Sequence, residues 1–377
     1  MCAEFNLTSN HQSSPAWSSW NKEVTKRNGQ SFYFASHILR SEQRRRAYQV
    51  YALCRIIDDA TDEHLVSDAV AAQNVASGPA GSEISQALTG LLFSGKPILT
   101  VQHENPSFWF ELKKIVSHAL GLSSSVVADT DLVSYLEDMA HACQSMHLLP
   151  EHLEALVLGQ KSDEGFMQPA GFQDFYTYCY RVAGVVGLVM AKVFGAKEDL
   201  QTLRAAEHLG IAMQITNILR DIKEDFEDKQ RVYIPADLLK KFPCNLRLLL
   251  EQPSLAHGAP NFEQLVHEMA QWGITYYQSA LSGVAGIPSF RARVCVKAMA
   301  AIYSAILAKI YFFPLLPLTK RVVVSPLRKV TIFLCVLFGR SPLAAAGFNI
   351  ASLRRVRMHN ISKLTFNVLL GKPVEQQ

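Results

Sequence analysis

Charged residues are scarce in this sequence: Asp, Glu, Lys and Arg make up 19% of its 377 residues, whereas 49% are hydrophobic. Disordered chains have the opposite balance, so the composition excludes intrinsic disorder and predicts a large buried core. The 37 basic and 33 acidic residues leave a formal net charge of +4, which is too small an excess to indicate nucleic acid as a partner. We therefore expect an apolar globular protein that binds no nucleic acid.

Paired cysteines and a secretory signal are both absent. The seven cysteines are scattered without a CxxC pair, which argues against a zinc site and a disulfide framework. The first twenty residues are polar and lack the charged and then apolar regions of a signal peptide. We expect a protein that is not secreted and works in the reducing cytoplasm.

Long uninterrupted apolar runs are also absent. The closest candidate for a membrane span, 299–318, is broken by Lys309, Pro314 and Pro317. The segment 341–377 mixes basic with apolar residues, a pattern that fits an ordinary surface helix or a peripheral contact with an anionic membrane.

Proline punctuation predicts long helices. No proline occurs in residues 16–78 or 170–234, and the apolar residues of 48–57 follow the 3.6-residue period of a helix. Few alternating runs that would indicate strands occur, so we predict an all-α fold with a single large helical bundle. The expected organisation is a polar N-terminal segment, one helical domain and a basic, apolar extension, at residues 1–27, 28–340 and 341–377.

The first segment that carries chemistry is RIIDDATDE, residues 55–63. Asp58 and Asp62 are four residues apart, so their carboxylates share one helix face, and Arg55 lies one turn earlier. One interpretation is an exposed acidic face. The apolar residues of 47–57 favour another, in which these acids end a buried stretch.

A second acidic stripe follows later in the chain. Asn217, Asp221 and Asp225 recur every four residues, and Gln214 joins the same stripe. Their neighbours are apolar, and unpaired buried charges are costly. A Mg²⁺ ion resolves this conflict, because it takes carboxylate oxygens together with water and substrate phosphates as ligands. Mn²⁺ is the alternative metal.

Two such helices facing each other would hold metal ions in a pocket whose other walls are apolar. A substrate with a diphosphate head and a hydrocarbon tail matches that polarity. The metal would act as a Lewis acid for the loss of diphosphate, and Arg55, Arg220 and Arg231 lie beside the acids. The two motifs together therefore predict a site for a metal and a diphosphate.

With both motifs in view, the sequence resembles the squalene/phytoene synthase family of head-to-head prenyl transferases, and bacterial phytoene synthases in particular. The resemblance covers about residues 28–340. The segments that carry it are 31–33 with the arginine run 44–46, 51–62, 178–187, and 214–225 leading to 231–235, with a weaker match at Tyr303 and 320–322. The aspartate motifs are shared with the wider isoprenoid synthase fold, whereas the segment 178–187 is specific to this family.

The resemblance implies an all-α bundle of the isoprenoid synthase type with a central cavity. It also implies that Mg²⁺ ions bind two prenyl diphosphates, which condense head to head through a cyclopropylcarbinyl diphosphate. The implied metal ligands are Asp58, Asp59, Asp62, Asn217, Asp221 and Asp225. The implied substrate contacts are Arg55, Gln214, Arg220, Tyr303 and Arg321. Catalysis is assigned to Tyr178, near the developing cation and proton transfer, with Asp58, Asp62, Asp221 and Asp225.

Simpler interpretations stand beside these assignments. Tyr178 can be a core tyrosine whose hydroxyl finds a partner. The arginine run 44–46 is more typical of a solvated face, so we leave it out of the site. Asp163 is a weaker candidate, because residues 159–163 lack the Met of the family pattern.

Two residues bear on the length of the substrate. Phe32 and Ser36 are four residues apart and share a helix face. In relatives that use C15 substrates, a bulky aromatic side chain at the position of Ser36 closes the pocket floor, so the resemblance implies a deeper pocket here. We therefore expect two geranylgeranyl diphosphates (C20) to give phytoene.

Two alternatives remain open. Two farnesyl diphosphates (C15) would give presqualene diphosphate, dehydrosqualene or squalene. No Gly-rich nucleotide fingerprint follows a strand, so NADPH is not expected. The alternative of another class is a non-catalytic assembly factor of the same fold, and the retained aspartates argue against it.

Overall fold

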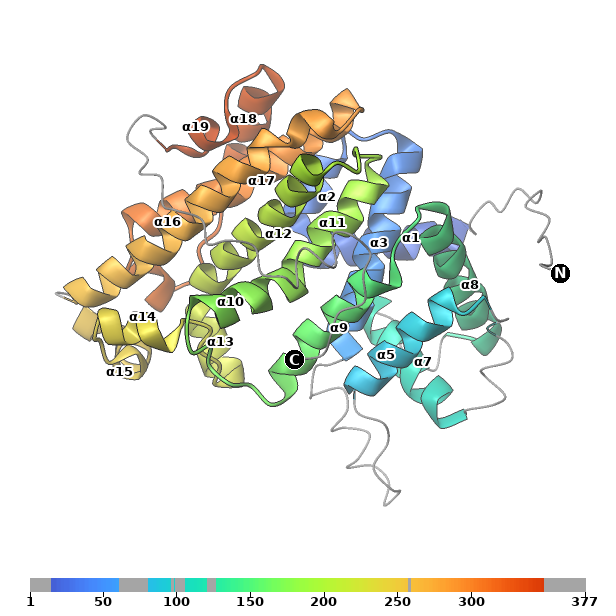
Figure 1. Cartoon of the computed structure of the whole chain (residues 1–377), viewed down its shortest axis with the longest axis horizontal. Helices are drawn as coiled ribbons and strands as arrows, with labels where there is room; N and C mark the ends of the chain where they lie inside the picture. Colours follow the sequence, from blue (N-terminus) through green and yellow to red (C-terminus); the bar gives the residue numbers. More distant parts are fainter. Residues whose placement is uncertain are drawn as a thin grey trace.

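The structure is a computed structural model that describes residues 15–60, 81–95, 98, 106–120, 127–256 and 259–348. Every regular element in these ranges is a helix, which confirms the predicted all-α fold. Figure 1 shows the helices gathered around α12, with α1 on the right and α18 and α19 at the upper left.

The helices of the first half of the chain are α1 (Pro15–Asn28), α2 (Gln30–Ser36), α3 (Ser41–Ala60), α5 (Gly81–Phe93), α7 (Pro106–Leu120), α8 (Asp129–Ser145), α9 (Pro150–Glu164), α10 (Phe172–Cys179), the π-helical turn η1 (Tyr180–Gly184) and α11 (Val185–Val193). Those of the second half are α12 (Leu200–Arg220), α13 (Ile222–Lys229), α14 (Ala236–Lys241), α15 (Leu246–Glu251), η2 (Pro253–Ala256), α16 (Pro260–Ser282), η3 (Val284–Gly286), α17 (Phe290–Phe312), η4 (Leu316–Leu318), α18 (Pro326–Leu337) and α19 (Pro342–Ala346).

Helix α12 is the centre of the bundle. It packs against α11, η1, α16 and α17, and these helices lie side by side in Figure 1. Apolar side chains such as Ile211, Ile215 and Leu219 are buried along it, as expected for a helix that is surrounded by others. Helix α12 also carries Gln214 and Asn217 of the second acidic stripe. The apolar packing of α12 therefore holds these polar residues in place.

Two glycines let α12 approach its neighbours closely. A Cβ atom on Gly187 would lie 2.1 Å from the carbonyl oxygen of Ala206, and one on Gly210 would lie 2.0 Å from that of Ala183. Glycine inside a helix costs about 1 kcal/mol relative to alanine. That cost is offset by tight packing, which brings η1 and α11 against α12.

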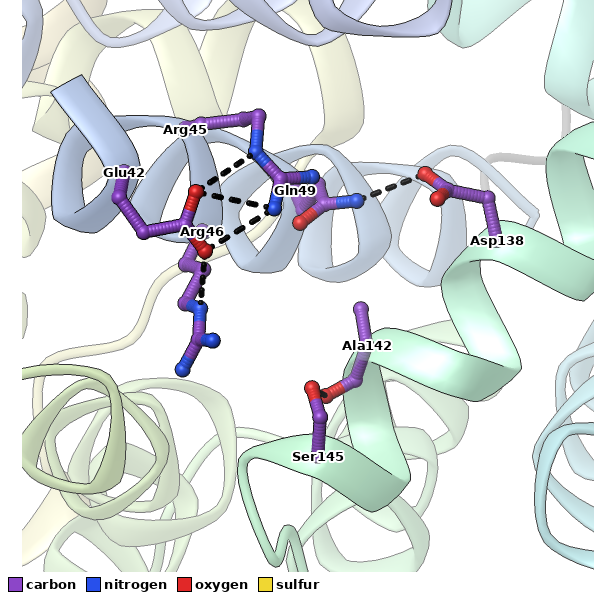
Figure 2. Close-up of polar contacts among 7 residues, drawn as sticks. All are labelled: Glu42, Arg45, Arg46, Gln49, Asp138, Ala142 and Ser145. Carbon is purple, nitrogen blue, oxygen red and sulfur yellow. Dashed lines mark hydrogen bonds and ion pairs between the residues drawn. The ribbon is translucent and has the colours of Figure 1, made fainter. Parts of the chain in front are cut away.

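Helix α3 positions the first acidic motif. The Gln49 Nε2 group donates a buried hydrogen bond of 2.7 Å to Asp138 Oδ2 of α8. Figure 2 shows this contact on one side of α3, and Arg45 and Arg46 turned toward Glu42 near its start. Two members of the arginine run 44–46 thus pair within the first turns of α3.

The second acidic stripe does not lie on one continuous helix. Helix α12 ends at Arg220, and α13 begins at Ile222, because Asp221 has φ −105° and ψ 12°. The hydrogen-bond ladder nevertheless continues across this residue: Asp221 N donates to Asn217 O and Asp225 N donates to Asp221 O, each at 2.8 Å. The four-residue spacing therefore keeps its common face.

Helix α17 is both long and apolar. Among the described residues it is the one helix long and apolar enough to cross a membrane, yet 72% of its most apolar window is buried inside the protein. Its central residues pack on α12 and α16. In this structure α17 is therefore a core helix.

Candidate active site

A large cavity lies within the bundle between α2, α3, α9, α11, α12 and α17. Its volume is about 1120 Å³, which exceeds the ~300–1,000 Å³ of most small-molecule sites. Its polar lining residues include Arg55, Asp58, Asp163, Tyr178, Gln214, Asn217, Arg220, Asp221, Glu224, Asp225, Lys229, Tyr233, Tyr303 and Arg321. Its larger apolar lining residues include Phe32, Leu156, Val186, Met190, Phe194, Leu209, Met213, Val284, Ile287, Val296, Met299 and Ile306.

The cavity is polar at one end and apolar along its depth. Lining residues extend from Thr202, near the start of α12, to Asp221, directly after its end, a separation of about 28 Å at a rise of 1.5 Å per residue. From Gln214 onward these residues are mostly polar or charged, whereas those before it are small or apolar. The site therefore suits a long molecule with one charged end.

Of the two described aspartates of the first acidic motif, one lines the cavity. Asp58 lines it and accepts a hydrogen bond of 2.6 Å from Arg55 Nη1. Asp59 does not line it: its side chain is 4% exposed and pairs with Arg55 and, at 3.8 Å, with His118. Adjacent helix residues do not share a face. Asp59 therefore points away from the cavity, contrary to the expectation that it is a metal ligand there. The expected ligand Asp62 lies outside the described residues.

The second acidic motif faces the cavity as a unit. Gln214, Asn217, Asp221 and Asp225 all line it. The Asn217 side chain donates a hydrogen bond of 3.3 Å to Gln214 Oε1, while its own oxygen is buried with no hydrogen-bond partner among the described residues. Burial, and then the nearby charge of Asp221, raise the pKa of Asp225 to about 7. This face has an excess of oxygen acceptors over positive charge.

These oxygens suit a hard cation, although they do not form a closed cage. Within the described ranges, no three His, Cys, Asp or Glu side chains converge as a metal site. The two motifs stand on different helices, and arginines hold Asp58 and Asp221. Carboxylate and amide oxygens are nevertheless the ligands that Mg²⁺ prefers, and the unpaired Asn217 oxygen fits a cation at this end of the cavity.

Three guanidinium groups gather at the polar end. Arg220 Nε donates a hydrogen bond of 2.8 Å to Asp221 Oδ1, and Arg321 Nε lies 3.1 Å from the same oxygen. The Tyr303 side chain lies close enough to interact with the guanidinium group of Arg220. Arginine is well suited to bind phosphate because its planar fork donates several hydrogen bonds. Together with Arg55, these side chains provide the anion-binding part of the site.

Tyr178 is held by a network that sequence reasoning found only in part. Its hydroxyl donates a hydrogen bond of 3.2 Å to Asp163 Oδ2, and that of Tyr233 donates one of 2.9 Å to Oδ1. The two rings stack at 4.9 Å, and Arg231 Nη2 donates to the Asp163 carbonyl oxygen at 2.7 Å. Burial, and then the charge of Asp163, raise the pKa of Tyr178 well above its usual value. Tyr178 is thus a neutral phenol in the cavity wall, and Asp163 belongs to the site.

The cavity residues that were not predicted include Tyr233 and Tyr51. Tyr233 lies in the loop between α13 and α14, and nothing in the sequence pattern places it beside Tyr178. Tyr51 lies one turn before Arg55 and two turns before Asp58, so the same helical spacing would have identified it. Its ring stacks on Phe32 at 5.8 Å, and both line the cavity.

Ser36 does not reach the cavity, so its expected role at the pocket floor is corrected. It is completely buried. Its hydroxyl lies 2.9 Å from that of Tyr48 and donates to the carbonyl oxygen of Tyr33 at 2.8 Å. The ring of Tyr48 packs edge-on against Phe32. Tyr48 therefore contacts both Ser36 and Phe32.

Comparison with known proteins gives consistent matches. A profile of the squalene/phytoene synthase family matches residues 25–328. The chain is 27% identical over 259 residues to the 15-cis-phytoene synthase of Pantoea ananas, which covers 68% of this chain and 71% of that protein. It is 26% identical over 312 residues to the phytoene synthase of Mycobacterium tuberculosis, which covers 82% and 86% of the two chains.

Solved structures of similar fold include a dehydrosqualene synthase in complex with a ligand, with a TM-score of 0.61 and 23% identity over 86% of this chain and 96% of that chain. A squalene synthase from Alicyclobacillus acidocaldarius has a TM-score of 0.57 at 19% identity, over 79% and 94% of the two chains. These likenesses concern the fold, and they confirm the expected helical bundle of the isoprenoid synthase type.

Proposed function

Since the chain belongs to the squalene/phytoene synthase family, we propose that it condenses two geranylgeranyl diphosphates head to head, through a cyclopropylcarbinyl diphosphate, to phytoene. The match over residues 25–328 confirms the family and the prenyltransferase class that the sequence motifs predicted. Relatives named phytoene synthase support the product.

The observation that carries the proposal is the division of one cavity into a charged end and an apolar depth. Asp58, Asn217, Asp221 and Asp225 face the end where Arg55, Arg220 and Arg321 also lie. Beyond it, the walls are apolar side chains of α11, α12 and α17. A prenyl diphosphate has the same division, so its head and tail are both matched by one binding mode.

The length of the cavity supports the longer substrate. An extended chain advances about 1.25 Å per C–C bond, so the 15 main-chain bonds of a C20 tail span about 19 Å and the 11 bonds of a C15 tail about 14 Å. The lining residues of α12 extend over about 28 Å. A C20 tail with its diphosphate head fits this length, and each further buried CH₂ contributes about 0.8 kcal/mol.

The charged end is where the diphosphate would leave. Asp58, Asn217, Asp221 and Asp225 would hold Mg²⁺, with Mn²⁺ as an alternative that accepts the same oxygen ligands. When bound, the metal supplies Lewis-acid stabilisation of the charge on the departing diphosphate. Arg220, now paired with Asp221, adds a guanidinium at the same position.

Tyr178 lines the cavity beside Asp163 and Tyr233. As a neutral phenol held by Asp163, it presents the negative face of its ring and its hydroxyl oxygen to a developing allylic cation. The pair Asp163 and Tyr233 fixes its position, so Tyr178 can also exchange a proton without moving. The apolar walls exclude water, which would otherwise capture the cation.

The two alternatives lead to different products. Two farnesyl diphosphates would give C30 presqualene diphosphate, dehydrosqualene or squalene, the last of which requires a reductant such as NADPH. A non-catalytic assembly factor would give none. The intact second acidic motif, which faces the cavity as a unit, favours an enzyme over that factor.

The test is to incubate the purified protein with Mg²⁺ and either geranylgeranyl or farnesyl diphosphate, with and without NADPH, and to identify the hydrocarbon by mass spectrometry. A C40 product formed without NADPH is expected. A C30 product alone would overturn the assignment to phytoene. Absence of diphosphate release from either donor, in protein with an intact helical spectrum, would support the non-catalytic alternative.

The proposal includes a cytoplasmic protein in peripheral contact with a membrane. The C40 hydrocarbon is insoluble in water, so a bilayer is its natural destination. Substrates with C20 tails also partition into bilayers, because burial of each CH₂ favours the apolar phase by about 0.8 kcal/mol.

A further inference from the structure

Charge is strongly segregated along the chain. Residues 269–374 contain none of the 33 acidic residues but 14 of the 37 basic ones. The net charge of the whole chain is close to zero, but the charged residues of this C-terminal region are all basic. Such asymmetry is typical of a region that meets an anionic surface.

Helix α18 lies within this basic region and is apolar on both sides. Ile332 and Val336 face the protein and are buried, and Phe333 packs edge-on against Phe34 of α2. The opposite side, which we call the outer face of α18, consists of Leu327, Val330, Leu334 and Phe338, of which Leu327 is 77% and Phe338 84% exposed. These four residues follow the i, i+3, i+7, i+11 spacing of one helix face.

Exposed apolar side chains concentrate in this part of the molecule. Of the twelve large apolar side chains that the described residues expose, seven fall within residues 312–338. They are Phe312, Phe313, Val323, Leu327, Val330, Leu334 and Phe338. A helix with apolar side chains on both its inner and its outer side is normally covered on both, and exposed apolar surface of this extent marks an interaction site.

Among the described residues, the basic side chains around the outer face have no acidic partner. Lys320, Arg328 and Arg340 make no ion pair with Asp or Glu there, whereas Arg45 and others elsewhere pair with a neighbouring Glu. The Arg328 side chain donates to the carbonyl oxygen of Ala345, at 3.1 Å. Their positive charge is thus available to an external anion.

The outer face is continuous with the cavity. Residues 321–326 and Lys329 line the cavity, and the exposed side chains of Val323 and Leu327 belong to the same stretch. Figure 1 shows α18 and α19 on the outer side of α17, at the edge of the molecule. The segment that leads into α18 therefore forms part of the cavity wall.

We infer that the outer face of α18 docks on an anionic lipid bilayer, with its apolar side chains in the acyl boundary and the surrounding Lys and Arg at the headgroups. Helices with an apolar face and a basic rim bind in this way. A bilayer matches both features and also receives or supplies molecules with long hydrocarbon tails through the adjacent cavity wall. That last role rests on the proposed function, whereas the docking itself does not.

The experiment measures co-flotation of the full chain with vesicles of phosphatidylcholine, with and without about 30% phosphatidylglycerol. We expect binding to the anionic vesicles that weakens at high salt, and weaker binding to the neutral ones. The double variant Leu334→Ser and Phe338→Ser should reduce binding about tenfold or more. The matched control is Phe110→Ser with Met167→Ser, since these exposed apolar residues lie away from α18 and should leave binding unchanged.

Three outcomes would overturn the inference. Equal binding by the wild type and the α18 variant would exclude the outer face. A dimer that the α18 variant converts to a monomer, detected by light scattering, would make the face an interface between copies of the chain. Amide exchange in α18 that is already slow without vesicles and unchanged with them would show that the chain covers the face itself.

The failure of the proposed function can be told apart from the failure of docking. With detergent-dispersed substrate, the α18 variant should form product at the wild-type rate, because neither substituted residue lines the cavity. A chain that binds vesicles but forms no product retains the docking surface and loses the proposed reaction.

Discussion

The Tyr176 hydroxyl donates a hydrogen bond of 2.6 Å to Glu207 Oε1 in the interior of the bundle, where α10 meets α12. Glu207 is completely buried, and its second carboxyl oxygen has no hydrogen-bond partner among the described residues. Burial raises the pKa of Glu207 to about 7, although the hydrogen bond from Tyr176 opposes the shift. A carboxyl group in the core of the fold therefore titrates near neutral pH.

We predict that Glu207 makes the protein less stable as pH rises from about 4.5 to about 7. In that window the folded state keeps a proton that the unfolded state has released, so the free energy of unfolding falls, by about 3 kcal/mol in total. Glu207→Gln should remove this contribution. The measurement compares urea midpoints of the wild type and the variant at pH 5.5 and pH 8.

The control for this prediction is Glu154→Gln, a change of the same kind at an exposed position of α9. Its urea midpoint should follow the wild type at both pH values. If the difference between the two pH values is the same for Glu207→Gln as for the wild type, the Glu207 carboxyl does not titrate in this window.

Asp58 and Asp59 are adjacent but should respond differently to the same substitution. Asp58→Asn removes a charge that faces the cavity, so turnover should fall about 10²-fold or more while the urea midpoint changes little. Asp59→Asn removes the buried carboxylate that pairs with Arg55. We expect the free energy of unfolding to fall by about 1–3 kcal/mol. Steady-state kinetics and urea unfolding of both variants separate the two effects.

Asp221→Asn should behave like Asp58→Asn, because Asp221 faces the same end of the cavity. Both variants should keep the helical circular dichroism spectrum of the wild type. Unfolding of either one would mean that these carboxylates serve the fold, and an active Asp58→Asn variant would remove Asp58 from the site.

Tyr178 and Tyr233 both donate a hydrogen bond to Asp163. Removing the hydroxyl group of each should lower kcat by different amounts. Tyr178→Phe keeps the ring stack but removes the hydroxyl from the cavity, so kcat should fall about 10²-fold with little change in KM. Tyr233→Phe removes only a bond that positions Asp163, and we expect a smaller decrease. Tyr311→Phe, outside the cavity, is the control. Equal kinetics for Tyr178→Phe and the wild type would make Tyr178 a core tyrosine.

The sequence was informative wherever function follows helical spacing. The four-residue repeat of Asn217, Asp221 and Asp225 placed all three on one face, and the structure brings them to the same cavity as Asp58. Local periodicity suffices here, because neighbours three or four residues apart share a helix face whatever the rest of the fold does.

Helical spacing did not predict the contacts that depend on tertiary packing. Asp59 turns away from the cavity to pair with Arg55 and His118, and Ser36 is covered by Tyr48 from the next helix. Tyr233 reaches Tyr178 only because the loop after α13 folds back on α9. Contacts between residues far apart in sequence have no periodic signature, so these details could be obtained only from the structure.

Ala206 offers a test of substrate length. Its side chain lines the cavity fifteen residues before Asp221, which is about 22 Å along α12. Behind the same diphosphate head, a C20 tail of about 19 Å extends about 5 Å deeper than a C15 tail of about 14 Å, so a larger side chain at this depth obstructs the longer tail more. Ala206→Phe should therefore reduce kcat/KM for geranylgeranyl diphosphate about tenfold or more and reduce any turnover of farnesyl diphosphate much less.

The smaller change Ala206→Val guards against misfolding, because the Ala206 backbone packs against Gly187. It should show the same preference for the shorter donor to a lesser degree, at an unchanged urea midpoint. An equal loss for both donors would mean that position 206 affects the shape of the whole cavity. No loss with either donor would mean that the C20 tail does not extend along α12, because a phenyl group at this depth would occupy the space that its last isoprene unit requires.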